Sequence, residues 1–120
     1  MKKKVILVQD NIEILEIMDQ VLDDAGFDVI GSLNTDPIEN VESIDPDIVI
    51  VDDHIKGEVK GSQVIKELKS DPETESIPAV LTSTSSSLPK DAQQCKADDF
   101  IEKPFGIDEM LEVIERNVDK

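Results

Sequence analysis

Residues 48–51 read Ile-Val-Ile-Val, and two aspartates, Asp52 and Asp53, follow this apolar run directly. A strand with one solvent-exposed face alternates apolar and polar residues, whereas a strand buried on both faces is apolar throughout. Strands of the second kind occur in parallel sheets that helices cover on both sides. The run therefore predicts a central strand of such a sheet. Carboxylates at the end of a buried strand are costly unless they are paired or bind a metal, so both aspartates are candidates for a site.

Strand-like and helical segments alternate along the rest of the chain. The strand-like segments are residues 4–9, 28–32, 47–52, 78–82 and 99–102, and the helical segments are residues 14–25, 36–44, 61–70, 89–97 and 107–118. The segment 89–97 follows a serine-rich stretch and has few apolar residues, so its helix is predicted to be short. The alternation with short connections predicts an α/β fold, with a five-stranded parallel sheet and helices on both of its faces.

Apolar spacing indicates which side of each helix is buried. In the first helix the predicted core face comprises Ile14, Ile17, Met18, Val21, Leu22 and Ala25. In the last helix it comprises Ile107, Met110, Leu111, Ile114 and Val118. Spacings of three and four residues place side chains on one side of an α-helix, so both helices are predicted to pack on the sheet along one stripe.

Length and composition restrict the classes of protein that fit this chain. Its 120 residues predict one domain over residues 1–120, and no output segment is expected after residue 118. No apolar run approaches the ~20 residues of a membrane span, so no membrane association is expected. Cys95 is the single cysteine, which excludes an internal disulfide and fits a reducing, cytoplasmic location. The net charge of −16 argues against a nucleic-acid partner, because phosphate backbones need clustered Lys and Arg.

Polar residues gather where the predicted strands end. In parallel sheets, ligands bind beyond the carboxyl ends of the strands, at the point where the strand order reverses. The residues at these ends are Gln9, Asp10, Asp52, Asp53, Thr82, Ser83, Lys103 and Pro104. The sequence therefore predicts a cluster of two or three carboxylates, a hydroxyl and a lysine.

The chemistry available to such a cluster is limited. Carboxylate oxygens suit Mg²⁺, and a carboxylate can attack phosphorus to form an aspartyl phosphate. A lysine and a hydroxyl can stabilise the charge on the phosphoryl oxygens. His54 is the only histidine, which makes a Ser-His-Asp arrangement improbable, and the chain has no Gly-rich phosphate loop. The cluster thus favours a phosphoacceptor over a turnover enzyme.

The order and spacing of four motifs give the chain a family resemblance. The motifs are "VILVQDN", "PDIVIVDDHIKGEVKG", "IPAVLTS" and "ADDFIEKPF". Together they resemble the receiver domain of two-component response regulators, of the stand-alone single-domain type, from the first strand to the last helix. The resemblance implies a flavodoxin-like strand order, 2-1-3-4-5. The loop over residues 54–61 is one residue longer than is usual in the family.

The resemblance also implies which residues accept the phosphoryl group and hold the metal. Asp52 matches the phosphoacceptor. Asp10, Asp52 and the backbone carbonyl of His54 match the ligands of Mg²⁺. Gln9 stands where the family usually has a first acid. Its amide oxygen can hold a metal-bound water but brings no charge, so Mg²⁺ binding is expected to weaken rather than vanish.

The switch residues are likewise implied by the resemblance. Thr82 matches the switch hydroxyl, Phe100 the switch aromatic and Lys103 the phosphate-binding lysine, and a cis peptide bond is expected before Pro104. His54 and Thr84 occupy positions that line the path of the hydrolytic water in the family, where they tune the lifetime of the phosphoryl group.

The function implied is that of a phosphorelay switch. A histidine kinase or a histidine phosphotransfer protein presents a phosphohistidine, and Asp52 takes the phosphoryl group. The added charge then biases the face made by residues 89–97, 99–102 and 107–118 between two states. A downstream protein, which the sequence does not identify, is expected to bind this face. The alternative that two copies of the chain dimerise through the same face also remains. Such a protein catalyses at most its own phosphorylation and dephosphorylation.

Two alternatives remain open from the residues. The first is a pseudo-receiver that binds proteins without phosphorylation, which Gln9 favours and the intact Asp52, Thr82 and Lys103 oppose. The second is a hydrolase with an aspartate nucleophile. Such enzymes have a D-x-D motif directly after the strand, whereas here His54 occupies the position of the second acid. Asp53 is interpreted as a solvated or helix-capping residue, because adjacent strand residues point to opposite faces.

Overall fold

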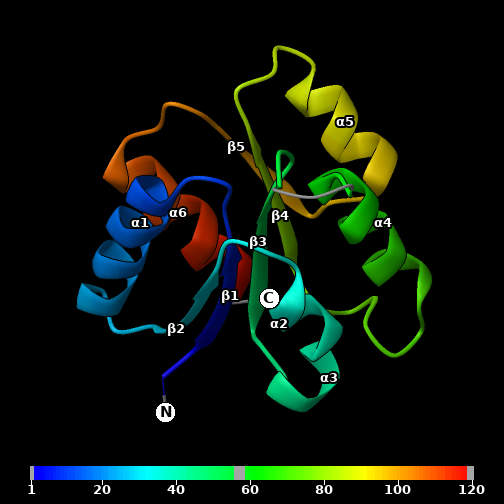
Figure 1. Cartoon of the computed structure of the whole chain (residues 1–120), viewed down its shortest axis with the longest axis horizontal. Coiled ribbons are helices and arrows are strands. Elements are labelled where there is room, and N and C mark those ends of the chain that lie inside the picture. Colours follow the sequence, from blue (N-terminus) through cyan, green and yellow to red (C-terminus); the bar gives the residue numbers. More distant parts are fainter. Residues whose placement is uncertain (1, 56–58, 119–120) are drawn as a thin grey trace.

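The computed structural model describes residues 2–55 and 59–118, in which strands and helices alternate (Figure 1). The strands are β1 (Lys4–Val8), β2 (Asp28–Ser32), β3 (Ile48–Asp52), β4 (Ala79–Ser83) and β5 (Asp99–Glu102). The helices are α1 (Ile12–Asp24), α2 (Asp36–Glu39), α3 (Val41–Ile44), α4 (Gly61–Ser70), α5 (Leu88–Cys95) and α6 (Ile107–Val118). Within these residues no helix has the length and apolar character needed to cross a bilayer.

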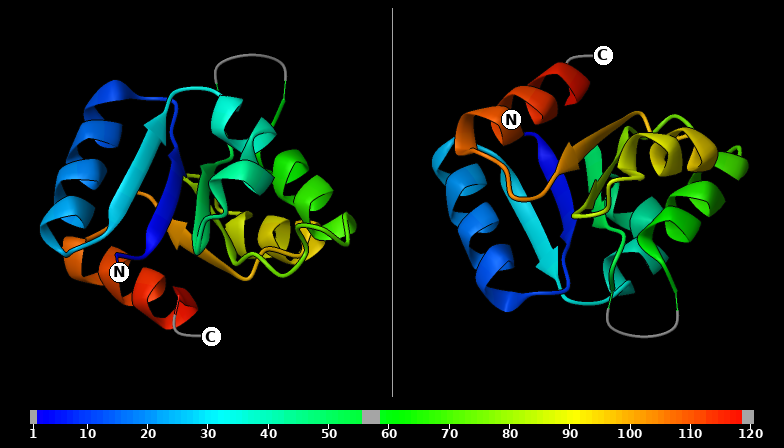
Figure 2. Two further views of the ribbon diagram at one scale, coloured as in Figure 1. Left: turned by 90° about the horizontal axis from the view of Figure 1, so that it is seen from below. Right: turned by 90° about the horizontal axis from the view of Figure 1, so that it is seen from above.

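The five strands form one parallel sheet in the order β2-β1-β3-β4-β5, which confirms the predicted α/β fold and strand order. Helices α1 and α6 cover one face of the sheet, and α2 to α5 cover the other (Figure 2). All five residues of β3 are buried, as the unbroken apolar run predicted. β2 lies on one side of β1, whereas β3, β4 and β5 follow on the other side, so the strand order reverses between β1 and β3. The carboxyl ends of these two strands therefore border the point where a ligand is expected.

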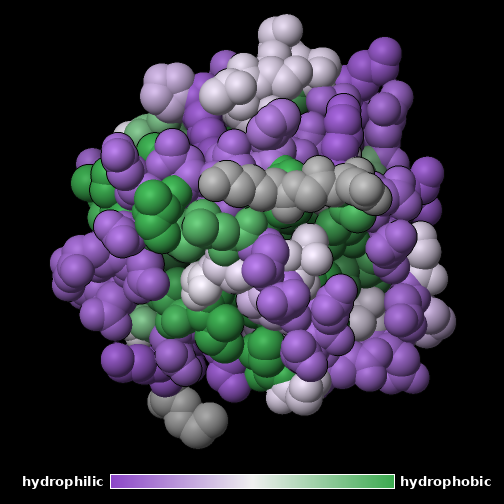
Figure 3. Space-filling view, viewed as in Figure 1, coloured by the Kyte–Doolittle hydropathy of each residue, from purple (hydrophilic) through white to green (hydrophobic). Residues whose placement is uncertain are grey.

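Alternate residues of the central strands supply two separate core layers. Ile48 and Ile50 pack under α1 and α6, whereas Val49 and Val51 pack under α4 and α5. This division follows from the two-residue period of a strand, which sends neighbouring side chains to opposite faces. Outside these layers the surface is mainly hydrophilic, and on the face drawn in Figure 3 the hydrophobic residues gather in its middle.

The prediction of one continuous helix over residues 36–44 is wrong. It forms two short helices, α2 and α3, separated at Asn40, whose φ of −106° and ψ of 19° lie outside helical values. The Asn40 side chain donates from Nδ2 to the carbonyl oxygen of Asp36 at 3.0 Å, the oxygen that a continuous helix would offer to the Asn40 backbone. Ser43 adds a second local bond, from its hydroxyl to the Asn40 carbonyl at 3.2 Å. Such side-chain bonds compete with the helix and break it here.

The predicted core face of the first helix is also partly wrong. Ile17 is 57% exposed and Ala25 is exposed, while the buried residues of α1 are Leu15, Met18 and Leu22. Residues 14, 15, 17 and 18 are all apolar, so the sequence offers two overlapping stripes, and packing against the sheet selects the one through Leu15. Ile107 in the last helix is likewise exposed. The other helices and strands lie within one or two residues of their predicted bounds, and α4 and α6 match theirs at both ends.

Asp99 ties the edge strand β5 to α6. It accepts hydrogen bonds from Arg116 Nε at 2.7 Å and Nη2 at 2.9 Å, and from Asn117 Nδ2 at 2.9 Å. Burial acts to raise the pKa of Asp99, but these bonds outweigh it and hold the pKa below its usual range. A lowered folded pKa stabilises the protein above the unfolded pKa of ~3.9, and this contribution is lost as pH falls through the folded pKa.

Replacing Asp99 by asparagine should therefore destabilise the protein at neutral pH and matter less in acid. We expect the variant to lose at most ~1 kcal/mol of unfolding free energy at pH 7, because Arg116 is largely exposed and solvent screens the pair. Urea unfolding of both proteins at pH 7 and at pH 3 measures the difference. A difference of equal size at both pH values would contradict the assigned role of the carboxylate.

Candidate functional site

The site is built around Asp52, the last residue of β3. The side chain of Asp52 is buried, and the residue is only 3% exposed. Asp52 pairs in register with Thr82 of β4, and the next backbone amide, Asp53 N–H, donates to the Thr82 carbonyl at 2.8 Å. The ladder therefore holds the two side chains at the same level of the sheet.

Three donors surround the Asp52 carboxylate. Lys103 Nζ lies 2.7 Å from Asp52 Oδ1, and the Thr82 hydroxyl donates to the same oxygen at 2.8 Å. The other oxygen, Oδ2, accepts from the backbone N–H of His54 at 3.0 Å. A buried carboxylate is costly without such partners, and here one cation and two hydrogen bonds offset that cost.

Lys103 reaches the site from the loop after β5. Its backbone N–H donates to the Ser83 carbonyl at 2.9 Å, and its bond to Pro104 is cis, as the family resemblance implied. The side chain is only 13% exposed, and Nζ lies 3.9 Å from Asp10 Oδ1 in addition to its contact with Asp52. One lysine thus stands between the two carboxylates that sequence reasoning assigned to the site.

Gln9, at the end of β1, is fully buried beside the same cluster. Its backbone N–H donates to the Ser32 carbonyl at 3.1 Å, which continues the pairing of β1 with β2. Its side-chain Nε2 donates to the Thr82 hydroxyl oxygen at 3.2 Å. Gln9 Oε1 is buried and has no hydrogen-bond partner among the described residues.

A polar cleft of about 540 Å³ opens over the cluster, lined by residues that include Asp10, Asp52, His54, Thr84 and Lys103. The side chains of His54 and Thr84 are exposed. The structure therefore brings together Gln9, Asp10, Asp52, Thr82 and Lys103, and leaves His54 and Thr84 on the rim. Phe100 does not line this cleft and is 37% exposed on β5.

Asp53 has a separate task. Its Oδ1 accepts a hydrogen bond from the backbone N–H of Ser62 at 3.0 Å, in the first turn of α4. The first N–H groups of a helix lack internal partners, and a carboxylate there satisfies one of them and complements the helix dipole. The helix-capping alternative for Asp53 is confirmed. The two neighbouring aspartates thus face different partners.

Gly61 is a residue of the site that sequence reasoning missed. A Cβ built on Gly61 would overlap the carbonyl oxygen of Asp52 and lie 2.7 Å from its carbonyl carbon. Gly61 N–H also donates to the Asp53 carbonyl at 3.1 Å. The backbone of α4 therefore touches the backbone of residues 52–53, here named the acceptor segment because it carries the candidate acceptor Asp52. A glycine at the very start of a helix, soon after two aspartates, was the available signal.

The donor set fits Mg²⁺ through two carboxylates. Mg²⁺ is commonly held by one or two carboxylates together with waters and phosphate oxygens, which matches Asp10 and Asp52. In residues 2–55 and 59–118 no group of three or more His, Cys, Asp or Glu side chains could hold a metal ion, in keeping with an amide at position 9. The ligand role of the His54 carbonyl stays a prediction. The lengthened loop, residues 54–61, lies partly outside the described residues because it includes 56–58.

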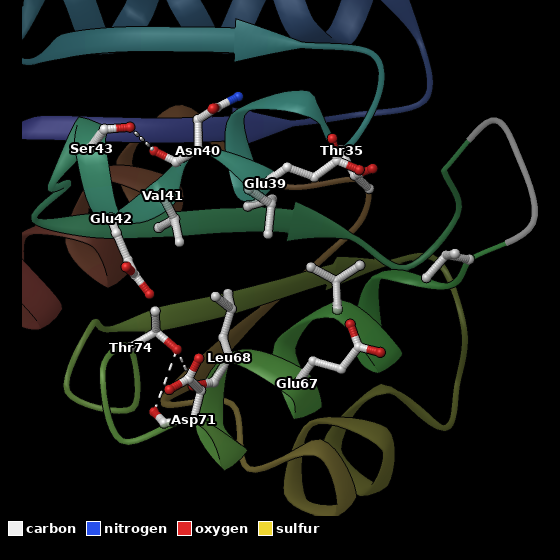
Figure 4. A pocket seen from close by; sticks show the side chains of 13 residues that line it. Thr35, Glu39, Asn40, Val41, Glu42, Ser43, Glu67, Leu68, Asp71 and Thr74 are labelled. Carbon is white, nitrogen blue, oxygen red and sulfur yellow. Dashed lines mark hydrogen bonds between the residues drawn. The ribbon is translucent and has the colours of Figure 1, made fainter.

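A larger hollow, of about 680 Å³, lies away from the cluster, between α2 and α3 on one side and α4 on the other (Figure 4). Acidic side chains line it, among them Glu39, Glu42, Glu67 and Asp71. None of the residues predicted to form the site lines this hollow. Cys95 is no candidate nucleophile either, because burial raises the pKa of its thiol. The convergent groups around Asp52 remain the candidate site.

Comparison with known proteins adds a family and close structural relatives. A family model for the response regulator receiver domain matches residues 5–115. Chemotaxis protein CheV1 of Helicobacter pylori is 33% identical over 109 residues, which cover 82% of this chain and 33% of CheV1. The chain thus spans about a third of the length of this curated relative.

Solved structures agree on the fold. The chemotaxis response regulator CheY4 of Vibrio cholerae is 22% identical, with a TM-score of 0.87 over 98% of this chain and 99% of that chain. The receiver domain of the sensor histidine kinase PA1611 from Pseudomonas aeruginosa PAO1 is 17% identical, with a TM-score of 0.88 over 100% of both chains. That structure has a magnesium ion coordinated in its active site cleft.

Proposed function

Because this chain belongs to the response regulator receiver domain family, we propose that it is a phosphoacceptor switch whose acceptor is Asp52. One observation carries the proposal. Lys103 Nζ and the Thr82 hydroxyl, from two different parts of the chain, meet on a single oxygen of a buried carboxylate, at 2.7 and 2.8 Å. A buried structural aspartate also needs partners, but this one lines an open polar cleft, and its lysine lies 3.9 Å from a second carboxylate, Asp10, as a phosphoacceptor site requires.

The proposed reaction is transfer from a phosphohistidine. The donor is a histidine kinase or a histidine phosphotransfer protein. An oxygen of Asp52 forms a bond to phosphorus while the nitrogen–phosphorus bond breaks, and the electron pair of that bond stays on the imidazole. Lys103 then pairs with phosphoryl oxygens and offsets their charge, which is ~−1.5 to −2 at neutral pH. The protein catalyses at most this step and the later loss of the phosphoryl group.

Mg²⁺ is the proposed cofactor. Asp10 and Asp52 would hold it, together with the backbone carbonyl of His54 and, through a water, Gln9. When bound, the ion supplies positive charge at the phosphoryl oxygens. Lys103 Nζ, 3.9 Å from Asp10 Oδ1, supplies a further positive charge at the same carboxylates. The magnesium in the cleft of the PA1611 receiver domain supports this choice of metal.

The proposed output is a change in the face made by α5, β5 and α6. Thr82 and Phe100 couple the phosphoryl group to this face, and a downstream protein, or a second copy of the chain, reads it. The exposed Phe100 ring supports this proposal because a partly exposed aromatic residue has room to change its rotamer. His54 and Thr84 line the cleft, which supports the proposal that they tune the lifetime of the phosphoryl group.

Incubation with acetyl phosphate and Mg²⁺ tests the proposal directly. Intact-mass measurement should show a gain of one phosphoryl group, and borohydride reduction followed by peptide mapping should locate it at Asp52. Chelation of Mg²⁺ with EDTA should reduce the labelled fraction strongly. Absence of any mass gain over a wide range of Mg²⁺ concentrations would overturn the proposal.

A second candidate function is a phosphorylation-independent binding module. Gln9 favours it, because an amide replaces an acid beside the proposed metal and is tied to Thr82 at 3.2 Å. The same mass measurement separates the two functions, since the binding module takes up no phosphoryl group. Lys103 and Thr82 favour the switch, because both bind the Asp52 carboxylate and neither is needed for a docking surface alone.

A further inference from the structure

A directed chain of hydrogen bonds links the ends of three strands. Gln9 Nε2 of the β1 end donates to Thr82 Oγ1 of β4 at 3.2 Å, and Thr82 Oγ1 donates to Asp52 Oδ1 of β3 at 2.8 Å. Gln9 and Thr82 are both 0% exposed, so no solvent competes for these bonds. The Thr82 hydroxyl thus contacts the proposed acceptor carboxylate directly.

The chemistry of an amide makes this chain possible. A hydroxyl has one hydrogen, and Thr82 donates it to the anionic oxygen of Asp52. The hydroxyl oxygen of Thr82 is then free to accept a hydrogen bond. The NH₂ group of Gln9 supplies the donor that this oxygen needs. A carboxylate at position 9 has no hydrogen to give when ionised, and it would compete with Asp52 for the single Thr82 hydrogen. With a carboxylate at position 9 as well as at position 52, the Thr82 hydroxyl would therefore be held less firmly in one orientation.

The amide orientation leaves the other polar atom of the Gln9 side chain without a partner in the part of the chain that the structure describes. Gln9 Oε1 is buried without a hydrogen-bond partner among the described residues, and an unsatisfied buried acceptor is destabilising. Turning the amide over would give Thr82 an acceptor instead of a donor. The single hydroxyl hydrogen of Thr82 could then bond either to Gln9 or to the charged Asp52, but not to both. The observed orientation keeps the charge-assisted bond to Asp52, which is the stronger of the two.

We infer that Gln9 is a positioning residue that holds the Thr82 hydroxyl on the Asp52 carboxylate before any phosphoryl group arrives. Its consequence for signalling rests on the proposed function. Phosphorylation does not need to draw Thr82 inward in this chain, because Gln9 already keeps it there. Phe100, which is 37% exposed, is then the switch residue left to change its rotamer.

The rotamer of Thr82 in the resting protein tests the inference. Three-bond NMR couplings from the Thr82 γ-methyl carbon to the backbone nitrogen and carbonyl carbon report its χ1 angle, which occupies one of three staggered wells. We expect single-rotamer couplings in the unmodified wild-type protein and little change after acetyl phosphate and Mg²⁺ are added. Rotamer-averaged couplings in the unmodified wild type would overturn the inference.

Two substitutions of Gln9 remove the donor in different ways. Gln9→Glu keeps the shape and adds a charge, and Gln9→Met keeps the length without charge or donor. Both should give averaged Thr82 couplings at rest and a larger change on phosphorylation, with Gln9→Glu the stronger. Gln63→Glu on α4, where the side chain is exposed, adds the same charge at a distance and should leave Thr82 unchanged. Wild-type couplings in both Gln9 variants would overturn the inference.

The test separates this inference from the proposed function. The resting couplings need no phosphoryl group, so they decide the role of Gln9 even if acetyl phosphate fails to label the protein. Labelling with averaged resting couplings in the wild type would leave the switch intact and refute the role of Gln9. Gln9→Met keeps the comparison open if the buried charge of Gln9→Glu prevents folding.

Discussion

Replacing Asp52 by asparagine is expected to abolish the phosphoryl mass gain, whereas the same change at Asp53 should leave it intact. Asparagine has nearly the shape of aspartate but no anionic oxygen to attack phosphorus. At position 52 that oxygen is the one to which Lys103 and Thr82 converge. At position 53 the carboxylate accepts from Ser62 N–H, and an asparagine oxygen can accept the same bond.

The two neighbouring variants control for each other. Each removes one negative charge from the same short segment, so a general effect of charge on the cleft should appear in both. Intact mass after incubation with acetyl phosphate and Mg²⁺ is the measurement, with circular dichroism to confirm folding. Equal labelling of Asp52→Asn and wild type would refute Asp52 as the acceptor, and loss of labelling in Asp53→Asn alone would move the acceptor to Asp53.

Among the substitutions proposed, Gly61→Ala should cause the largest loss of stability. The added methyl group would overlap the Asp52 carbonyl oxygen and lie 3.0 Å from the Asp53 Cα, and both are backbone atoms that cannot turn aside. The acceptor segment or the start of α4 must shift. We expect a loss of about 3 kcal/mol of unfolding free energy, the upper end of the usual range for overpacking. Urea unfolding measures it.

Gly106→Ala is the matched control for this substitution. Nothing lies within 4 Å of a Cβ built on Gly106, which sits in the loop before α6. Its stability should stay close to that of the wild type. Similar unfolding free energies for both alanine variants would show that α4 does not rest on the acceptor segment. Because that segment carries Asp52, Gly61→Ala should also lower the labelled fraction under conditions where the variant is folded.

The sequence predicted the framework of the site because strand ends are easy to locate. Ile48 to Val51 are apolar throughout, so the end of β3 and the position of Asp52 follow directly from the pattern. The same reasoning placed Asp10, Thr82 and Lys103 at the ends of the strands beside it. Parallel register then brings the ends together, which is why long-range contacts such as Lys103 to Asp52 could be anticipated.

The parts that escaped prediction depend on local choices between nearly equal options. Leu15 and Ile17 are both apolar, and only the seating of α1 on the sheet decides which is buried. Asn40 can continue a helix or bond its own backbone, and it does the latter. The bond from Gln9 to Thr82 requires knowing the rotamers of two residues 73 positions apart, which no pattern in the sequence encodes.

Each strand end around Asp52 contributes a different part of the site. Gln9 follows β1, Asp52 ends β3, Thr82 lies near the end of β4, and Lys103 follows β5. A chain in which any one of these strands is out of place would lack part of the proposed phosphoacceptor site, however intact the remainder. On the proposed function, only completely folded copies of the chain would therefore take up a phosphoryl group.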